Sequence, residues 1–374
     1  MARHLVLVGA GHAHLMTLKN LREFTARGHR VTVVSADAYH YYSGMGPGML
    51  SGIYRPQDIR FHVKKMVEDR GGLFVKDRVV RIDPGGRVLS LASGNEITYD
   101  VVSFNTGSDV PSNHISSSDE RIVKVKPIIN LLRARQSILD IGRTGSLHLV
   151  VAGGGAAGVE IAGNLQRLIH ENGIAATITL VAGTGLLGKV PRKVREAAHR
   201  SLEKRGVEVI EGDRVLSLQD GAVILPGGRT LPLDMLFLAL GVIPSALFRE
   251  SGIPTGEDGG LLVNDFLESV AYPGLFGGGD CISLQSRPLN KVGVYAVRQN
   301  PVLLSNLLAS LEGKPLSAFV PGGAYLLILN MGNGKGILWK KEWVLQGRIA
   351  FLLKDYIDRR FMKTYQVSGE RDES

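Results

Sequence analysis

Cysteine is almost absent from the chain, because Cys281 is the only one among 374 residues. A single thiol excludes both an internal disulfide and a redox-active cysteine pair. The shortage also favours a reducing compartment, so we expect a cytoplasmic protein. We expect Cys281 itself to be a small buried residue rather than a reactive one.

Long apolar runs are also missing. The longest uncharged apolar stretch covers residues 235–248 and is interrupted by Gly241 and Pro244. It is shorter than the roughly 20 residues that a membrane-spanning helix needs. With 44% hydrophobic and 21% charged residues, the chain is nevertheless apolar enough to form two packed cores.

Glycine, by contrast, is abundant, and many of the 47 glycines cluster where apolar runs end. The run 4–8 leads into the turn 9–14, GAGHAH, and the run 147–152 leads into the turn 153–158, GGGAAG. In a strand-turn-helix unit such glycines let the backbone approach a pyrophosphate at the start of the helix. Two such turns in one chain predict two dinucleotide sites that face each other.

Both turns lie in predicted βαβ units of a doubly wound parallel sheet. The first unit has strands at 5–8 and 30–34 around a helix from about His12 to Ala26, and the second surrounds a helix at about 157–171. We expect the glycine-rich segment 41–53 to be a loop. The fold class is therefore α/β, with Rossmann-like domains for FAD and for NAD(P) and a C-terminal α+β region.

The FAD-binding domain is expected to be discontinuous, because the late cluster Gly277 to Asp280 must return to the ligand held by the first turn. We assign residues 1–115 and 256–318 to this domain. Residues 116–255 would form the NAD(P)-binding domain, and 319–374 the C-terminal region.

Flavin binding is the main functional prediction. Gly9 and Gly11 would bracket the pyrophosphate, and Asp280 would accept hydrogen bonds from the hydroxyls of the flavin sugar-alcohol chain. A purely structural Gly-Asp turn is the alternative. The expected FAD contacts are Gly9, Gly11, His12, Ala13, Ser35, Asp37, Ser43, Thr106, Gly107, Gly279, Asp280, Tyr295 and Ala296.

The first motif departs from the usual dinucleotide pattern in two places. His14 replaces the third glycine, and Ser35 stands where a ribose-binding carboxylate is expected, with Asp37 two residues later. Nothing near His12 and His14 completes a metal site, so we expect turn and packing residues and no metal.

The second site has a similar gap. An acid that would bind the 2′-hydroxyl of NADH is expected near Ala182, where none occurs. Lys189, Arg192 and Lys193 can meet an NADPH phosphate, or they can form a solvated helix face. The expected NAD(P) contacts are Gly153, Gly155, Ala156, Ala157, Gly158, Glu160 and Gly241.

The order of these motifs resembles the two-dinucleotide-binding-domain flavoproteins of the pyridine nucleotide-disulfide oxidoreductase superfamily. The segments that carry this resemblance are 9–11, 99–107, 153–160, 234–244 and 279–280. Within the superfamily, residues 294–299, VYAVRQ, are similar to the type II NADH:quinone oxidoreductases. The loop 42–48, YSGMGPG, resembles the FAD module fused to selenide, water dikinase in some bacteria.

The resemblance implies FAD as cofactor, NAD(P)H as electron donor with NADH favoured, and a quinone or similar small molecule as acceptor. It makes Glu160 and Gln299 the catalytic candidates. Glu160 would position the nicotinamide or relay protons, although the helix dipole alone could explain its place. Gln299 would line the quinone pocket, or simply belong to a packed helix. Without a cysteine pair, electrons would pass directly from nicotinamide to flavin to acceptor.

Much of the formal net charge of +9 comes from residues 335–365, where eight Lys or Arg face three acids. Apolar residues recur at helical spacing over 349–357. A basic amphipathic helix in 337–365 can bind the inner face of the cytoplasmic membrane, dock its apolar side on the protein, or form a homodimer contact. Docking is the simplest arrangement, since the basic residues would then face water. No nucleic-acid motif accompanies the charge, so we expect no such partner.

Three functions therefore fit the sequence. The leading hypothesis is an FAD-dependent NAD(P)H dehydrogenase that reduces a quinone or similar acceptor. The alternatives are a flavoprotein oxidoreductase of selenium or sulfur metabolism, and a nicotinamide-sensing regulatory flavoprotein of the apoptosis-inducing-factor type.

Overall fold

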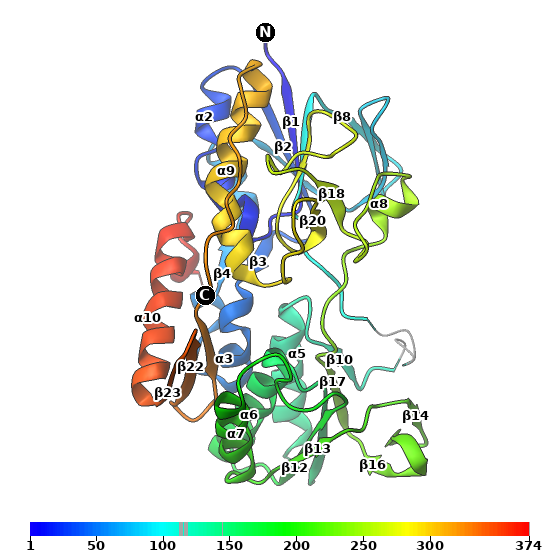
Figure 1. The fold of residues 1–374 in the computed structure, drawn as a ribbon, viewed down its shortest axis with the longest axis vertical. Coiled ribbons are helices and arrows are strands. Elements are labelled where there is room, and N and C mark those ends of the chain that lie inside the picture. Colours follow the sequence, from blue (N-terminus) through cyan, green and yellow to red (C-terminus); the bar gives the residue numbers. More distant parts are fainter. Residues whose placement is uncertain (112–114, 116–118, 144, 374) are drawn as a thin grey trace.

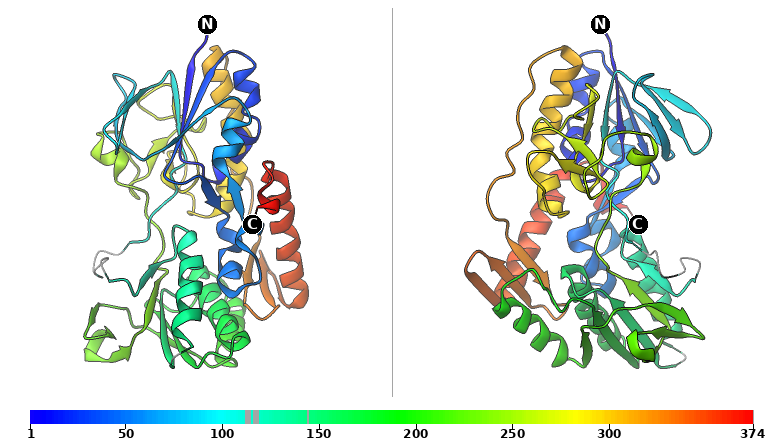
Figure 2. Two further views of the ribbon diagram at one scale, coloured as in Figure 1. Left: turned by 180° about the vertical axis from the view of Figure 1, so that it is seen from behind. Right: turned by 45° about the vertical axis from the view of Figure 1, so that its right-hand side comes forward.

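The computed structural model describes residues 1–111, 115, 119–143 and 145–373. Residue 116, where we place the boundary between the first two domains, lies outside this part of the chain. Two α/β lobes are stacked along the long axis, and the C-terminal helix α10 lies along one side (Figure 1). The back view shows α10 on the outside of the molecule (Figure 2).

The first lobe is built on a five-stranded sheet with the order β19-β9-β1-β2-β5. All its pairs are parallel. Its strands are β1 (His4–Val8), β2 (Arg30–Ser35), β5 (Leu73–Lys76), β9 (Val101–Phe104) and β19 (Leu275–Gly277). Every residue of β1 and β9 is buried, as expected for parallel strands that are covered on both faces. Because β19 pairs with β9, a late segment completes the sheet begun at the N-terminus.

The second lobe repeats this architecture with the strand order β10-β17-β11-β12-β13. The strands are β10 (Ile122–Lys124), β11 (Leu147–Ala152), β12 (Ala176–Ala182), β13 (Val207–Glu211) and β17 (Met235–Leu238). Its helices are α5 (Ile129–Ile141), α6 (Ala156–Glu171) and α7 (Arg192–Glu203). The predicted α/β fold class with two Rossmann-like units is confirmed.

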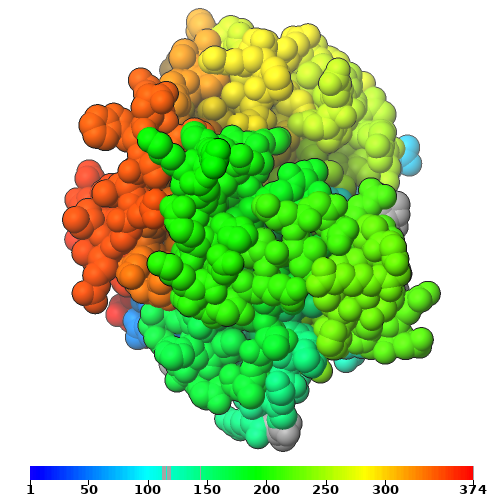
Figure 3. All heavy atoms as spheres, turned by 60° about the horizontal axis from the view of Figure 1, so that its bottom comes forward, coloured from blue at the N-terminus to red at the C-terminus, as the bar shows by residue number. Residues whose placement is uncertain are grey.

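Further elements complete the two lobes, among them the 20-residue helix α9. They are β3 (Tyr39–Tyr41), β4 (Arg60–His62), α4 (Val63–Glu68), β6 (Val79–Asp83), β7 (Val88–Leu91), β8 (Glu96–Thr98), β14 (Ser217–Gln219), β15 (Ala222–Ile224), β16 (Thr230–Pro232), α8 (Leu247–Glu250), β18 (Leu261–Val263), β20 (Ile282–Leu284) and α9 (Gly293–Glu312). The C-terminal region adds the antiparallel sheet β21 (Leu327–Asn330), β22 (Gly336–Lys340) and β23 (Trp343–Gly347), then α10 (Arg348–Tyr365). Viewed from the end of the second lobe, this region packs beside the green surface of that lobe (Figure 3).

The single helix predicted from His12 to Ala26 is wrong. The chain instead forms the 3-10 turn η1 (His12–His14), the short helix α1 (Leu15–Lys19) and the short helix α2 (Arg22–Thr25). The side chain of His14 explains the 3-10 start. In the second lobe Gly158 occupies the corresponding place, and a Cβ atom there would lie 1.8 Å from the carbonyl oxygen of Gly153.

In the first lobe this space is filled by the imidazole of His14. It is fully buried, with Nδ1 2.7 Å from the oxygen of Gly9 and Nε2 2.8 Å from Oγ of Ser103. The prediction that His14 is a turn and packing residue is confirmed.

The prediction that the glycine-rich segment 41–53 is a loop is wrong. The segment contains the 3-10 turn η2 (Ser43–Met45) and the helix α3 (Gly46–Ser51), all six residues of which are buried. Helix α3 packs against α5 and α6 and so joins the two lobes. A Cβ atom on Gly48 would lie 2.5 Å from the Tyr54 ring, so this glycine permits close packing rather than a loop.

Helix α10 does not dock its apolar side, contrary to the arrangement we considered simplest. The residues that it buries are Ala350, Lys354, Asp358, Met362 and Tyr365. Its apolar residues Ile349, Leu352 and Tyr356 are 69%, 63% and 61% exposed. Within the described residues, no helix is long and apolar enough to cross a bilayer.

The C-terminal sheet meets α6 at a close backbone contact, which generates a stability prediction. Gly332 has φ +82°, and a Cβ atom on it would lie 2.1 Å from the oxygen of Gly163. We expect Gly332→Ala to lower the Tm. Gly334→Ala is the matched control, because Gly334 has φ +69° but nothing within 4 Å. We expect the clash to lower the free energy of unfolding of Gly332→Ala by about 1–3 kcal/mol more than that of Gly334→Ala. Equal Tm losses in thermal unfolding would show that this contact does not support the fold.

Candidate functional site

The first glycine turn is held by the side chain of Asn105, at the end of β9. The backbone N–H of Ala13 donates to Asn105 Oδ1 at 3.0 Å, and Asn105 Nδ2 donates to the oxygen of Gly278 at 2.6 Å. Gly9, with φ +82°, lets the backbone pass so close that a Cβ atom would lie 2.4 Å from the oxygen of Asn105. One carboxamide thus joins the first turn to the third glycine cluster. The sequence shows Asn105 only as a residue after a buried strand, so its role was missed.

The second glycine turn has the same close approach. Gly153 has φ +122°, and a Cβ atom on it would lie 2.2 Å from the oxygen of Ala239. Gly155 caps the N-terminus of α6, and no atom lies within 4 Å of its virtual Cβ. Gly241, with φ +88°, also faces open space. The first N–H groups of α6, at Ala156 and beyond, therefore border a space that a pyrophosphate can fill.

Asp280 lies directly after Gly279, in the 3-10 turn η5 (Gly279–Cys281). Its Oδ2 accepts hydrogen bonds from Lys126 Nζ and from Ser108 Oγ, both at 2.8 Å. Burial opposes ionisation, but Lys126 and Ser108 outweigh it and lower the pKa of Asp280 below its usual value. An ionised carboxylate has about four lone-pair positions, so Asp280 can also accept bonds from ligand hydroxyls. Neither Lys126 nor Ser108 was identified from the sequence.

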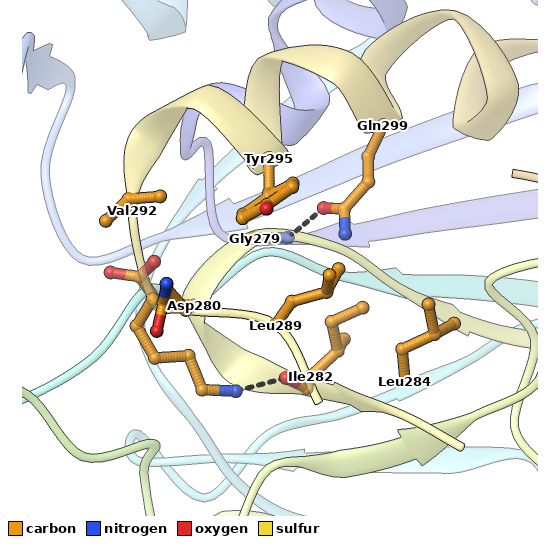
Figure 4. Close-up of a pocket in the computed structure, with 10 residues that line it drawn as sticks. Gly279, Asp280, Ile282, Leu284, Leu289, Val292, Tyr295 and Gln299 are labelled. Carbon is orange, nitrogen blue, oxygen red and sulfur yellow. Dashed lines mark hydrogen bonds between the residues drawn. The ribbon is translucent and has the colours of Figure 1, made fainter. Parts of the chain in front are cut away.

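A pocket opens between Asp280 and the start of α9 (Figure 4). Its lining residues are Gly279, Asp280, Ile282, Leu284, Leu289, Asn290, Lys291, Val292, Tyr295 and Gln299. Gln299 is buried, and its Oε1 accepts the N–H of Gly279 at 2.6 Å. Tyr295 and Gln299 therefore lie in the pocket wall together with Asp280, whereas Ala296 is buried behind them.

Two imidazoles lie beside the first turn. The ring of His12 is 5.0 Å from that of His40 and 5.3 Å from that of Tyr42. Burial lowers the pKa of His12 to about 4 and that of His40 to about 3, so both rings are neutral at pH 7. Their Nε2 atoms are buried and have no hydrogen-bond partner within the described part of the chain. Among the described residues, no group of three His, Cys, Asp or Glu could hold a metal ion.

Glu160 is the fifth residue of α6, one turn further into the helix than the dipole interpretation assumes. Its Oε1 accepts the backbone N–H of Asn330 in β21 at 2.7 Å. Burial raises the pKa of Glu160 to about 7, although the nearby Lys354 lowers it. Near pH 7 this carboxyl group can therefore both give and take a proton.

Lys354 is a buried cation on the inner side of α10. Its Nζ donates to Asp358 Oδ2 and to the oxygen of Gly44, both at 2.8 Å. The hydroxyl of Tyr42 donates to the other oxygen of Asp358 at 3.0 Å. Burial opposes the charge of Lys354, but Asp358 and Glu160 keep its pKa above its usual value. In the sequence Lys354 counts as one of several surface cations, so this cluster was missed.

The remaining predicted contacts have less distinctive surroundings. Ser35 ends β2, and the exposed Asp37 accepts the N–H of Tyr39 at 3.2 Å. Ser43 begins η2, next to Tyr42. Thr106 is exposed, and Gly107 has φ +75° with open space around it. These positions stay predicted FAD contacts.

The end of β12 lacks an acid, as the sequence indicated. Exposed Arg214 lies next to it, since a Cβ atom on Gly183 would be 3.5 Å from the Cβ of Arg214. Arg192 pairs with Glu196 at 2.5 Å on an exposed helix face. The interpretation of Arg192 as part of a solvated helix face therefore fits. Arg214 is a cation next to the end of β12, where a ribose-binding acid was expected and is absent.

Cys281 is buried and free, as predicted. Its Sγ lies 3.4 Å from the oxygen of Phe104, and burial raises the pKa of its thiol. A thiol in this state is a poor nucleophile.

Taken together, these residues fit a flavin dinucleotide at the first turn and a nicotinamide dinucleotide at the second. The first site offers a glycine turn, an ionised Asp280, and the buried Nε2 atoms of His12 and His40, which have no hydrogen-bond partner among the described residues. The second offers the open helix start behind Gly155.

Comparisons with known proteins agree with this geometry. Residues 3–300 match the model of the pyridine nucleotide-disulphide oxidoreductase family. Ferroptosis suppressor protein 1 of Taeniopygia guttata is 26% identical over 388 positions, which cover 98% of this chain and 96% of that protein. The external alternative NAD(P)H-ubiquinone oxidoreductase B1, mitochondrial, of Solanum tuberosum is 22% identical, over 76% of this chain and 56% of that protein. The structure of NDH2 from Plasmodium falciparum in complex with NADH superposes with a TM-score of 0.83 at 14% identity, covering 99% and 98% of the two chains. This last likeness establishes the fold.

The Asn105 clamp generates a binding prediction. We expect Asn105→Asp to weaken FAD binding, because the donor to the oxygen of Gly278 becomes a second acceptor and the turn loses its tie. An unsatisfied buried group costs about 1–3 kcal/mol, which corresponds to an affinity loss of about tenfold or more. Asn95→Asp, in an exposed hairpin turn, is the control. Flavin fluorescence on dilution measures release, and equal FAD affinity in both variants would refute the role of Asn105.

Proposed function

The chain belongs to the pyridine nucleotide-disulphide oxidoreductase family, and on this premise we propose that it is a dehydrogenase that passes electrons from NAD(P)H to a quinone. It is a flavoprotein oxidoreductase whose cofactors are FAD and NAD(P)H. Bound FAD supplies the two-electron chemistry between the nicotinamide and the acceptor. The observation that carries the proposal is the buried cluster of Glu160, Lys354, Asp358 and Tyr42.

The chain would hold FAD through the first turn and the residues that converge on it. Gly9 and Gly11 would allow the pyrophosphate to approach, Asn105 would fix the turn, and Asp280 would accept hydrogen bonds from ligand hydroxyl groups. The nicotinamide nucleotide would lie against Gly153, Gly155 and the start of α6. Gln299 and Tyr295 would line the pocket of the acceptor, in the wall beside Gly279.

The acceptor is argued from the proton chemistry. Reducing a quinone to a quinol requires two protons as well as two electrons, so a quinone site needs groups that hold protons near pH 7. Glu160, with a pKa of about 7, meets this requirement. The cation of Lys354 lies close enough to influence it, and Asp358 and Gly44 fix the position of Lys354. The name of the Solanum tuberosum relative supports an ubiquinone-like acceptor.

A disulfide acceptor is disfavoured by the single buried thiol. Disulfide reduction requires a cysteine pair beside the flavin, and Cys281 has no partner cysteine in the sequence. We therefore propose a diffusible acceptor. For the donor, NADH stays our preference from the resemblance, and Arg214 is the residue that would favour NADPH.

The two half-reactions can be tested on the purified protein. We expect it to be yellow, and anaerobic addition of NADH or NADPH should bleach the flavin absorbance. Subsequent addition of a soluble ubiquinone analogue should restore the absorbance. Bleaching without reoxidation by any quinone would refute the proposed acceptor, and failure of both nucleotides to bleach the flavin would refute the dehydrogenase itself.

A substitution of Glu160 tests the proton role. Glu160→Gln preserves the oxygen that accepts from Asn330, but it removes the titrating group. We expect kcat with a quinone to fall by about 10²-fold or more. The wild-type decline in rate above about pH 7, where Glu160 loses its proton, should disappear. Glu171→Gln, at the exposed end of the same helix, is the control and should leave both the rate and the pH profile unchanged.

Thermal unfolding provides an independent measurement for the same variant. The pKa of Glu160 rises from its ordinary 4.5 to about 7 on folding, so its contribution to stability is complete below pH 4.5 and is lost as the pH rises through 7. We therefore expect the Tm of Glu160→Gln minus the Tm of the wild type to be more positive at pH 8 than at pH 5. A pH-independent Tm difference would show that burial does not perturb this carboxyl group.

A further inference from the structure

Helix α6 carries an amide side chain one turn after Glu160, and this amide contacts the same residue of the C-terminal sheet. Asn164 Nδ2 donates to the backbone oxygen of Asn330 at 3.1 Å. Glu160 Oε1 accepts the backbone N–H of Asn330 at 2.7 Å. Residues four apart lie on one face of a helix. The two side chains of α6 therefore bind both backbone polar groups of a single residue of β21.

The amide of Asn164 is held in one orientation, because each of its polar atoms has a partner. Besides the bond to Asn330, its Nδ2 donates to the oxygen of Glu160 at 2.8 Å, and its Oδ1 accepts the hydroxyl of Ser51 at 2.7 Å. Asn164 is 0% exposed, and Ser51 and Asn330 are each 2% exposed. Turning the amide over would place its oxygen against two carbonyl oxygens in a buried site. One side chain thus joins α6 to both α3 and β21.

The chain after Asn330 is fixed as well. Its Oδ1 accepts the N–H of Gly332 at 2.9 Å. Gly332 in turn lies against α6, since a Cβ atom on it would be 2.1 Å from the oxygen of Gly163. The bond from Asn164 and this turn together hold the N–H of Asn330 toward Glu160.

This arrangement makes the two carboxyl oxygens of Glu160 unequal. When the group is protonated, its carbonyl oxygen is the better acceptor and faces the N–H of Asn330. That oxygen is Oε1, so the proton lies on Oε2. Among the described residues Oε2 has no hydrogen-bond partner, and it is not fully enclosed.

We propose that Asn164 is a positioning residue for proton transfer: it holds the N–H of Asn330 on Oε1 of Glu160 and so keeps the proton on Oε2, where a bound acceptor can take it. The inference rests on the proposed function, because that function gives Glu160 its role as a proton donor. A residue that only packs α6 against its neighbours would stabilise the fold without changing where or when Glu160 titrates.

Other charged groups face Glu160 from α10 and from the turn before α3. Beyond burial, which raises the pKa of Glu160, Lys354 lowers it, the backbone N–H from β21 lowers it, and Asp358 raises it. Burial, Asp358 and Glu160 raise the pKa of the Tyr42 hydroxyl. In the described part of the chain, none of these side chains bonds to Asn164. A substitution of Asn164 therefore changes the N–H contact and leaves the neighbouring charges in place.

Infrared titration of the holoenzyme tests the proposal without turnover. A protonated carboxyl group has a C=O stretch that carboxylates and amides lack, and the part of this band that disappears in Glu160→Gln reports Glu160. In the wild type we expect it to titrate near pH 7. Asn164→Leu, which is similar in volume but cannot donate, should raise the midpoint by about one pH unit, because the ionised form loses a hydrogen bond.

The rate of quinone reduction should change in the same way. In Asn164→Leu we expect the decline in rate above about pH 7 to move upward by the shift seen in the infrared titration. We expect kcat to fall by about tenfold or more, because the proton donor is no longer held in place. KM should change little, since Asn164 is buried away from the acceptor pocket.

Asn172→Leu is the matched control. Asn172 follows the same helix, and its Nδ2 donates to the oxygen of Leu168 at 2.8 Å, the same type of bond that Asn164 makes to Glu160. Within the described residues its side chain bonds to nothing in the C-terminal sheet. The control should keep the wild-type midpoint and kcat.

Ser51→Ala is a milder second variant, which releases the oxygen of the Asn164 amide without adding volume. It should raise the infrared midpoint in the same direction, by less than Asn164→Leu. An unchanged midpoint in both variants, with only a lower Tm, would overturn the proposal and leave Asn164 as a packing residue. If the midpoints shift as expected but no quinone is reduced, the proposed function fails while the placement of the proton on Glu160 is retained.

Discussion

The structure depends above all on the close meeting of three chain segments at the side chain of Asn105. Its carboxamide binds the backbone within the first turn, at Ala13, and the backbone before Asp280, at Gly278. Only glycines at positions 9 and 279 leave enough room, since a Cβ atom at either would lie 2.4 Å from an atom of Asn105. Segments about 100 and 280 residues from the N-terminus are thereby brought to one edge of the first sheet. The predicted FAD contacts Gly9, Gly279 and Asp280 lie at this edge.

The C-terminal helix depends on a different interaction, the buried pair of Lys354 and Asp358. A buried charge is tolerated when it is paired and hydrogen-bonded, and here Tyr42 and Gly44 supply the further bonds. The pair attaches α10 to the turn before α3, and α3 in turn packs between the lobes. One helix therefore presents a polar face to Tyr42 and Gly44 and an apolar face to the exterior. The proposed proton transfer thus depends on how this helix is held.

Sequence reasoning succeeded where a local pattern has a single structural outcome, and it failed where tertiary contacts decide. The two glycine turns predict Rossmann-like units, and the structure has them. The predicted first helix starts as a 3-10 turn at His14, where the pattern has glycine and where the imidazole bonds to the oxygen of Gly9. The segment 41–53 fails because glycine serves close helix packing as well as loops, and spacing alone does not distinguish the two. The buried position of Lys354 was missed, because the sequence shows that a residue is charged but not whether the fold buries it.

The sequence by itself determined the α/β class, the two glycine turns, the acid at position 280 and the absence of a cysteine pair, because each follows from residue type and short-range spacing. Only the tertiary structure decided which distant groups meet. It placed Lys126 on Asp280, Asn330 on Glu160, and Tyr42 on Asp358. It also decided which side of α10 faces outward. The reason is physical: hydrogen bonds and burial over separations of more than a hundred residues are fixed by the packing of whole elements, which local sequence does not encode.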